Sequence, residues 1–202
     1  MSQKDYLRDI SEIKNLMSKS SKFISLSGLS GILAGIYALI GAGYYYFAFD
    51  KKIDNSSQLT TDLVYSITII ILIVSFATTI TTIFFTSRRS KFTDEKTWSI
   101  TTRNLVKSYL TTLSIGGVYI IINLFQENYT HLIPLILLFY GLALINASKH
   151  TSNIVKPLGI IEVIFGLICA LFPSYSFWFW VIGFGIVHVV YGSIIYFKYD
   201  KK

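Results

Sequence analysis

Apolar runs of near-membrane length dominate the chain and restrict what it can fold into. A helix needs roughly 20 mostly apolar residues to cross a bilayer, at about 1.5 Å per residue. Six such runs are present, the fourth and fifth near the lower limit of length: about Phe23–Phe49, Leu63–Thr86, Asn104–Phe125, Leu132–Ala147, Pro157–Phe172 and Phe177–Phe197. The sequence therefore predicts an all-α, polytopic membrane protein whose residues 23–202 form six transmembrane helices, arranged as three hairpins.

The composition favours the same class. Hydrophobic residues make up 52% of the 202 residues and charged residues only 14%, whereas about a quarter of the residues in soluble domains are charged. The first apolar run lacks the features of a cleavable signal peptide, so we expect it to act as an uncleaved anchor. The single cysteine, Cys169, cannot form an internal disulfide, and we expect it to be a small buried apolar residue.

The positions of the basic residues predict the orientation of the chain. Sixteen of the 18 Lys and Arg residues fall before the first run, between the second and third or in the first turn of the third, between the fourth and fifth, or after the sixth. The other side holds only Lys51 and Lys52. Under the positive-inside rule both termini are then cytoplasmic, which fits a bacterial inner-membrane protein. The net charge of +7 is explained by this topology, so the lipid bilayer rather than nucleic acid is the expected partner.

Residues 1–22 form a polar leader with a helical pattern. Tyr6, Ile10, Ile13 and Met17 recur at helical spacing, and lysines flank that stripe. The pattern is typical of an amphipathic cytoplasmic helix that lies on anionic lipid. Dimerisation through the apolar stripe is the alternative.

Small residues recur every four positions in the first run. Gly31 and Gly35 form one row, and Ala34 and Ala38 form a second. Small residues at this spacing let helix backbones approach closely in lipid. The first helix is therefore predicted to be central, or to pair with another copy of the chain or with a membrane partner.

The first run also resembles the fifth. The segment GILAGIYALIG aligns with GIIEVIFGLIC without gaps, which pairs Gly31 with Gly159 and Ala34 with Glu162. The match suggests the hypothesis that the hairpins share an ancestor. It also places an acid at a position where the related helix has alanine.

Glu162 is the polar residue that most needs a reason. An acid inside a membrane helix costs a few kcal/mol, so it usually faces protein or water and has a partner. It lies about 7–8 Å along the helix from Pro157. Other polar groups are expected near this depth: Arg103, Asn146, Lys149, His188 and Tyr191. The short loop after the fifth run makes the fifth and sixth helices neighbours, so Glu162, Tyr191 and His188 can meet.

Two interpretations of Glu162 stay open. It can be a buried latch that pairs with Arg103 or Lys149, or with Tyr191 and Asn146, and fixes the helix order. Alternatively, Glu162 and His188 form a titrating pair that lines a cavity open to the cytoplasm and passes protons.

Catalytic and metal-binding motifs are not evident. There is no zinc helix, nucleophile elbow or phosphate loop. The three histidines, His131, His150 and His188, are expected at three different depths and so do not form a metal site. We therefore expect no cofactor, no metal and no catalytic residue; an intramembrane enzyme is the least favoured function.

Three stretches also carry a family resemblance: YGLALINASKHT, LGIIEVIFGLICALFP and FWFWVIGFGIVHVVYGSIIYFKYDKK. With them the chain resembles small, uncharacterised six-span inner-membrane proteins of Bacteroidota. The last hairpin is also similar to that of the HdeD acid-resistance membrane family, which likewise has six spans. These resemblances imply six spans and supply no functional residues.

Two main functions follow as expectations. The first is a non-enzymatic membrane protein, with a role in envelope stress or as a partner subunit, whose leader and small-residue faces contact other proteins. The second is a small-solute or proton carrier that uses Glu162, His188 and Tyr191. The carrier hypothesis predicts a hydrated cavity that reaches Glu162.

Overall fold

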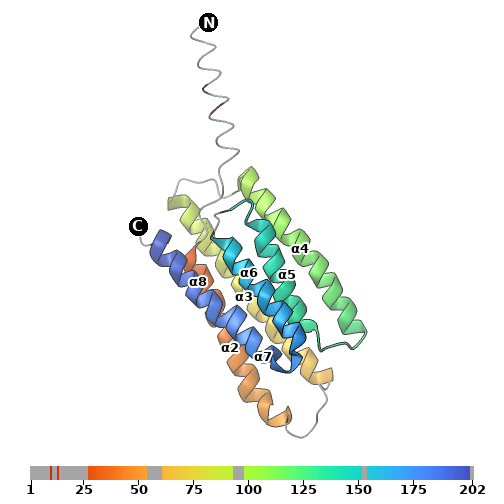
Figure 1. Ribbon diagram of the computed structural model, residues 1–202. Coiled ribbons are helices and arrows are strands. Elements are labelled where there is room, and N and C mark those ends of the chain that lie inside the picture. The colour runs from red at the N-terminus through yellow and green to blue at the C-terminus, as the bar shows by residue number, and fades with distance from the viewer. Residues whose placement is uncertain are drawn as a thin grey trace.

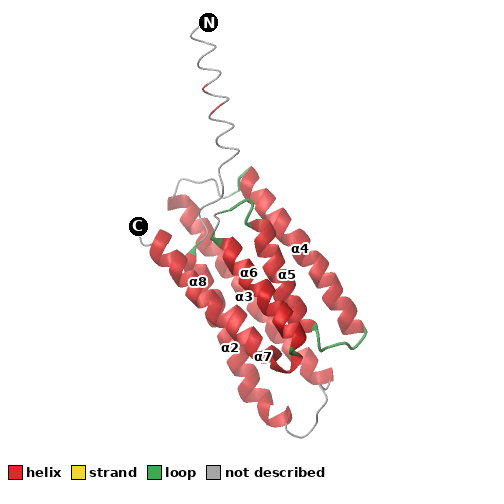
Figure 2. Cartoon of the chain, viewed as in Figure 1, coloured by secondary structure: helices red, strands yellow, loops and turns green. Residues whose placement is uncertain are grey.

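The computed structural model describes residues 27–53, 61–92, 98–151 and 154–200, together with Ile10 and Ile13. This part of the chain is helical apart from short turns and contains no strand (Figure 2). The predicted all-α class is therefore confirmed for the described residues. Ile10 and Ile13 of the predicted leader are helical and exposed, and the rest of residues 1–22 lies outside the described residues.

In the described part of the chain from residue 27 on, five helices precede a long final helical stretch. They are α2 (Gly28–Ile53), α3 (Thr61–Phe92), α4 (Ile100–Phe125), α5 (Leu132–Ala147) and α6 (Val155–Leu171). A 3₁₀ turn follows (η1, Pro173–Tyr175). The stretch Ser176–Asp200, called the last helix below, then runs through α7 (Ser176–Trp180), the π-helical η2 (Val181–Val187), α8 (His188–Ile195) and the π-helical η3 (Tyr196–Asp200).

Four of these helical segments are long and apolar enough to cross a membrane. In the described part of the chain they are Gly28–Ala48, Tyr65–Lys91, Ile100–Phe125 and Pro173–Lys198, and Leu132–Ala147 is a shorter apolar helix. Their surfaces carry many large apolar side chains, such as Phe47, Phe76 and Phe125, which are 70% exposed or more. Side chains of this kind are stable in that position when lipid covers them.

Some helix ends differ from the predicted limits. Helix α3 continues past Thr86 to Phe92, because the basic residues there favour the negative end of the helix dipole. Helix α4 begins at Ile100 rather than Asn104, because the side chain of Ser99 accepts a hydrogen bond from the backbone N–H of Thr102 and caps the helix.

The helices pack as two halves (Figure 1). Helix α2 packs against α3 on one side and against the last helix on the other. Helix α5 packs against α4 and α6. The two halves meet mainly where α7 and η2 of the last helix contact α5 and α6. We call the set of α2, α3 and the last helix the first half, the set of α4, α5 and α6 the second half, and their contact the seam.

Glycine contacts hold each half together. A Cβ atom on Gly31 would lie 3.1 Å from the Cα atom of Gly192 in the last helix. In the second half, a Cβ atom on Gly141 of α5 would lie 2.6 Å from the carbonyl oxygen of Gly159 in α6. Backbones can approach this closely only where both residues are very small. Helix α2 lies between α3 and the last helix, and a central position in the whole bundle stays a prediction.

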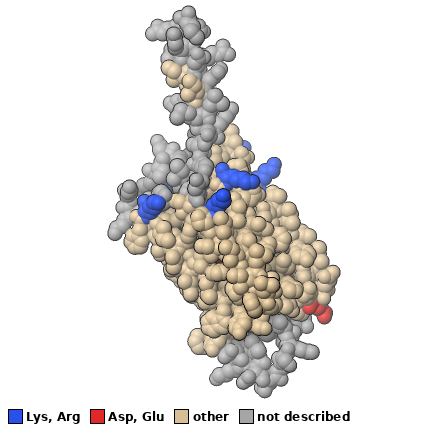
Figure 3. All heavy atoms as spheres, in the orientation of Figure 1, with Lys and Arg blue, Asp and Glu red and all other residues tan. Residues whose placement is uncertain are grey.

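Basic side chains gather at one end of the bundle (Figure 3). The described ones come from the end of α3, the start of α4, the α5–α6 connection and the end of the last helix: Arg88, Arg89, Lys91, Arg103, Lys107, Lys149, Lys156 and Lys198. We call this the basic end. The turn between α4 and α5, which holds Glu127, lies at the opposite end of the bundle (Figure 1).

Candidate functional site

Glu162 is completely buried in the middle of α6. Its side chain has no exposed surface. Neither of its carboxylate oxygens has a hydrogen-bond partner within the described part of the chain. Buried polar atoms in proteins are almost always hydrogen-bonded, so an acid in this condition calls for an explanation.

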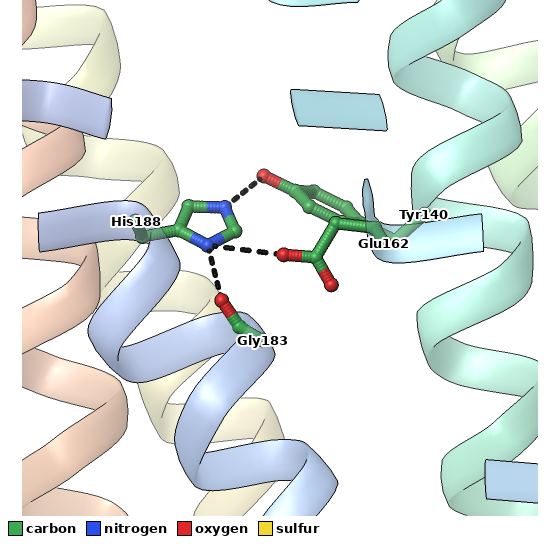
Figure 4. Close-up of polar contacts among 4 residues, drawn as sticks. All are labelled: Tyr140, Glu162, Gly183 and His188. Carbon is green, nitrogen blue, oxygen red and sulfur yellow. Dashed lines mark hydrogen bonds and ion pairs between the residues drawn. The ribbon is translucent and has the colours of Figure 1, made fainter. Parts of the chain in front are cut away.

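The ring of His188 is the polar group that faces this acid (Figure 4). Its Nδ1 atom lies 3.5 Å from Oε1 of Glu162 and 2.9 Å from the carbonyl oxygen of Gly183. A carbonyl oxygen can only accept a hydrogen bond, so we assign a proton to Nδ1. That proton is donated to the Gly183 carbonyl. It is not hydrogen-bonded to the carboxylate of Glu162, so the interaction between the ring and the carboxylate is mainly electrostatic. The predicted approach of Glu162 and His188 is therefore present.

Tyr140 of α5 completes the cluster. Its hydroxyl oxygen lies 2.7 Å from Nε2 of His188. With Nδ1 protonated, a neutral imidazole accepts this bond from the hydroxyl, and an imidazolium donates it to the hydroxyl oxygen. The contact is thus satisfied in both protonation states of the histidine. We call Tyr140, Glu162 and His188 the buried triad.

Sequence reasoning missed Tyr140 and selected Tyr191. Both tyrosines precede a glycine, in Tyr140–Gly141 and Tyr191–Gly192, and both lie within a few turns of a cytoplasmic loop in the predicted topology. This repeated Tyr–Gly pair was the sequence feature that could have marked Tyr140 as a candidate. It could not show which tyrosine faces Glu162, because that depends on which helices pack together.

Two glycine contacts place the triad. The close contact of Gly141 with Gly159 brings α5 onto α6, so Tyr140 comes beside Glu162, one turn beyond Gly159. Gly183 lets the last helix approach Glu162 equally closely, since a Cβ atom on Gly183 would lie 2.9 Å from Oε2 of Glu162. Gly183 belongs to the π-helical segment η2. Such wide turns are frequent at functional sites.

Aromatic rings close the surroundings of the triad. Phe184 stacks on His188 at 5.8 Å between centroids and contacts Tyr140 at 5.0 Å. Trp180 packs on Phe184 at 4.6 Å. The hydrated cavity predicted at Glu162 is therefore absent from the described structure, because rings and helix backbones fill the space and leave the acid no accessible surface. The conformation is an occluded one.

The triad can hold its protons in more than one way. An isolated carboxylate buried without partners costs several kcal/mol. Glu162 therefore carries a proton beside a neutral His188, or it is charged beside an imidazolium. These two arrangements hold the same number of protons, and release of one proton from either leaves a charged Glu162 beside a neutral imidazole. The chemistry that the site offers is proton binding and release.

Asn146 forms a separate polar contact. Its side-chain amide donates to the backbone oxygen of Ser108 at 3.1 Å and to the hydroxyl of Thr112 at 3.3 Å, both in α4. It therefore joins α4 to α5 and does not pair with Glu162. The latch interpretation that paired Asn146 with Glu162 is wrong, because Asn146 faces α4 while Glu162 faces the last helix.

The predicted latch cations and Tyr191 do not bond to Glu162 either. Arg103 is exposed at the basic end, with its guanidinium carbon 5.9 Å from the centre of the Trp98 ring. Lys149 is exposed as well. Tyr191 is half-buried one turn after His188, and its hydroxyl does not bond to Glu162, whose oxygens have no hydrogen-bond partner. The charged side chains stay near water, where their hydration is retained.

The predicted small-residue positions pack within the chain. A Cβ atom on Gly35 would lie 2.7 Å from the carbonyl oxygen of Gly185, and Gly31 meets Gly192, both in the last helix. Ala34 and Ala38 are buried. These four residues are thus occupied by an intramolecular contact. A homo-oligomer or a membrane partner stays a prediction that they do not support.

Metal ligands are not grouped in the described part of the chain. It contains no set of three His, Cys, Asp or Glu residues that could hold a metal ion. Cys169 is buried, with its sulfur 3.4 Å from the hydroxyl oxygen of Ser176.

No known protein family, curated protein or solved structure matches the chain. The resemblance to six-span proteins of Bacteroidota and to the HdeD family therefore stays a prediction. The proposed function therefore rests on the geometry of the buried triad.

Proposed function

We propose that the chain is a multi-pass protein of the bacterial inner membrane, with six transmembrane helices and both termini in the cytoplasm. Support comes from the four long apolar helices and from the basic end, where described Lys and Arg side chains gather. Helices α5 and α6 have 16 and 17 residues, or roughly 25 Å at 1.5 Å per residue. That is a few ångströms less than the hydrocarbon core, and packing against each other and against the last helix makes so short a crossing tolerable.

We propose further that the protein is a proton carrier in which Glu162 is the proton-binding group. One observation carries this: a fully buried carboxyl group with no hydrogen bond lies beside the His188 ring at the seam between two halves. An acid that served as a structural latch would be bonded to the group that it holds. The helices around Glu162 are already held by glycine contacts, so the fold has little need of the acid.

Carriage requires that the occluded triad reaches water on each side in turn. The seam is the natural place for such opening, because the contacts between the halves are sparser there than the contacts within each half. Proton uptake at the triad changes the charge balance between Glu162 on one half and His188 on the other. The attraction across the seam therefore changes with protonation, which couples the proton to the separation of the halves.

A flux assay tests the proposal. The purified chain is reconstituted into liposomes that contain a pH-sensitive dye, and a membrane potential is imposed with potassium and valinomycin. The wild type should acidify or alkalinise the interior faster than empty liposomes, and Glu162→Gln should reduce the rate to that background. Glu127→Gln, which changes an exposed acid in a turn, is the matched control and should match the wild type. A wild-type rate equal to that of empty liposomes would overturn the proposal.

A further inference from the structure

A second polar cluster lies between α4 and α5, on the side of the triad that faces the basic end. It consists of Ser108, Thr112 and Asn146. The amide of Asn146 bonds to both α4 residues, and the hydroxyl of Thr112 donates to the Ser108 carbonyl at 3.2 Å. Asn146 is six residues after Tyr140 in α5, or about 9 Å nearer the basic end.

Tyr109 bridges the interval between this cluster and the triad. It follows Ser108 in α4, and its ring meets the ring of Tyr140 edge to face, with 6.5 Å between centroids. The hydroxyl of Tyr140 in turn contacts Nε2 of His188. Between the α4–α5 cluster and Glu162, the side chains able to donate and to accept protons are thus Tyr109, Tyr140 and His188, of which Tyr140 and His188 are joined by a hydrogen bond.

The opposite side of the triad is apolar. Leu137 is fully buried against Gly183, and Phe165 of α6 packs on Phe179 of the last helix at 6.1 Å. The next described polar contact in that direction is between Cys169 and Ser176, whose hydroxyl donates to the Pro173 carbonyl at 2.6 Å. The groups that could carry a proton therefore lead away from Glu162 in one direction only.

We infer that the proton reaches Glu162 from the basic end, through the α4–α5 interface and then through Tyr140 and His188. The inference rests on the proposed proton carriage. The titratable groups that face Glu162 are His188 of the last helix and Tyr140 of α5, and the ring of Tyr109 of α4 contacts the ring of Tyr140. The side of α6 toward Leu137 contributes no charge.

The transfer starts from a charged Glu162 beside a neutral His188 that is protonated at Nδ1. A proton arriving from the α4–α5 side bonds to the hydroxyl oxygen of Tyr140 while the hydroxyl proton of Tyr140 moves to Nε2 of His188. Tyr140 stays neutral, and the ring becomes an imidazolium with a proton on each nitrogen. The Nδ1 proton then turns from the Gly183 carbonyl to Oε1 of Glu162, 3.5 Å from Nδ1. The Nδ1–H bond breaks and an O–H bond forms, which leaves a neutral acid and a neutral imidazole whose remaining proton is on Nε2 and is donated to the Tyr140 hydroxyl.

Infrared spectroscopy after a pH jump tests the route. The carbonyl band of protonated Glu162 is identified in proteoliposomes by its loss in Glu162→Gln. Its rise is then timed after a jump on either side. Labelling of Lys198→Cys with an impermeant thiol reagent tells which side carries the basic end. The band should rise promptly only when the pH falls at the basic end.

Two variants remove hydroxyl groups along the route, Tyr109→Phe and Thr112→Val. Each should slow the rise about tenfold or more and leave its final height unchanged. Tyr37→Phe is the matched control, because the Tyr37 hydroxyl contacts Thr81 at 3.3 Å, away from the route, and its rate should equal that of the wild type. If one route variant unfolds, the other still decides the matter.

The outcomes separate the two proposals. If the band responds to pH but both route variants keep the wild-type rate, or if a jump at the other end is as effective, the route is wrong and the role of Glu162 stands. If no band in the wild type responds to pH, proton binding at Glu162 is itself overturned.

Discussion

Gly183 lets the last helix approach Glu162 because it has no side chain. A Cβ atom at this position would lie 2.9 Å from Oε2 of Glu162 and 2.9 Å from Cδ2 of Leu137. Both atoms are side-chain ends and can shift, so a methyl group there would displace the acid without forcing the backbones apart. The carbonyl of the same residue holds the proton on Nδ1 of His188. One glycine therefore sets both the position of the acid and the tautomer of the histidine.

Gly183→Ala should lower the free energy of unfolding by about 1 kcal/mol, the low end for overpacking. Most of the protein should stay folded, but proton flux should fall strongly because the added methyl group displaces the carboxyl group of Glu162. The measurement is thermal melting in detergent together with the liposome assay. Gly117→Ala is the control: nothing lies within 4 Å of its added Cβ atom, so stability should hold or rise by up to about 1 kcal/mol. Wild-type flux in Gly183→Ala would contradict the role given to this contact.

Tyr140→Phe should cost about 1–2 kcal/mol of stability, because Nε2 of the buried His188 loses its partner. Melting curves in detergent measure this. The matched control is Tyr119→Phe, whose side chain is 49% exposed and whose loss of a hydroxyl should change stability by less than about 0.5 kcal/mol. Equal melting of the two variants would show that the Tyr140–His188 bond does not form.

At the level of helices, glycine contacts decide which elements pair. Gly192 of the last helix lies against the backbone of α2, and Gly141 of α5 lies against the backbone of α6. Lipid supplies no hydrophobic driving force for helix association, so close van der Waals packing between helices provides the stabilisation instead. These contacts explain why α2 pairs with the last helix and α5 with α6, and therefore why the triad assembles.

Gly192→Ala should destabilise the protein by about 3 kcal/mol, the upper end for overpacking. Its Cβ atom would lie 2.7 Å from the carbonyl carbon of Gly31 and 2.8 Å from the oxygen of Gly28, which are backbone atoms that cannot move alone. Gly43→Ala, with open space around the added atom, serves as the control in the same melting experiment. An unchanged melting temperature for Gly192→Ala would mean that α2 does not pack on the last helix here.

At the level of the whole molecule, the two halves and their seam define what can move. Within each half one helix pair meets through backbone-close contacts, α2 with the last helix and α5 with α6, whereas across the seam the packing depends on η2, α7 and the triad. Two rigid bodies joined by a sparse interface are suited to rocking motions around a site between them.

Distances between spin labels should report this motion. Labels at Lys156 in α6 and Lys198 in the last helix span the seam, while labels at Lys107 and Lys156 both lie in the second half; all three side chains are exposed. Pulsed electron paramagnetic resonance should show a pH-dependent distance for the first pair and a constant one for the second. Glu162→Gln should make the first distance independent of pH. A constant first distance in the wild type would contradict movement at the seam.

The sequence by itself determined the helical class, the approximate place of each apolar helix, the basic end, and Glu162 and His188 as two members of a candidate polar cluster. These follow from local properties, since hydropathy, length and helical periodicity act within one segment. The short loop between consecutive helices predicted that Glu162 could meet His188 or Tyr191, and depth alone did not separate these two.

Only the tertiary structure decided that Tyr140 rather than Tyr191 contacts the histidine, that Asn146 faces α4, and that Gly183 lies against the acid. These facts depend on which helices pack together and at what rotation, and that is set by contacts between residues far apart in the chain. Nothing in the sequence around Gly141 and Gly159 indicates that these two residues are in contact. Because a rotation of one helix by a single residue moves a side chain by about 100°, the partner of a buried group cannot be read from its own segment.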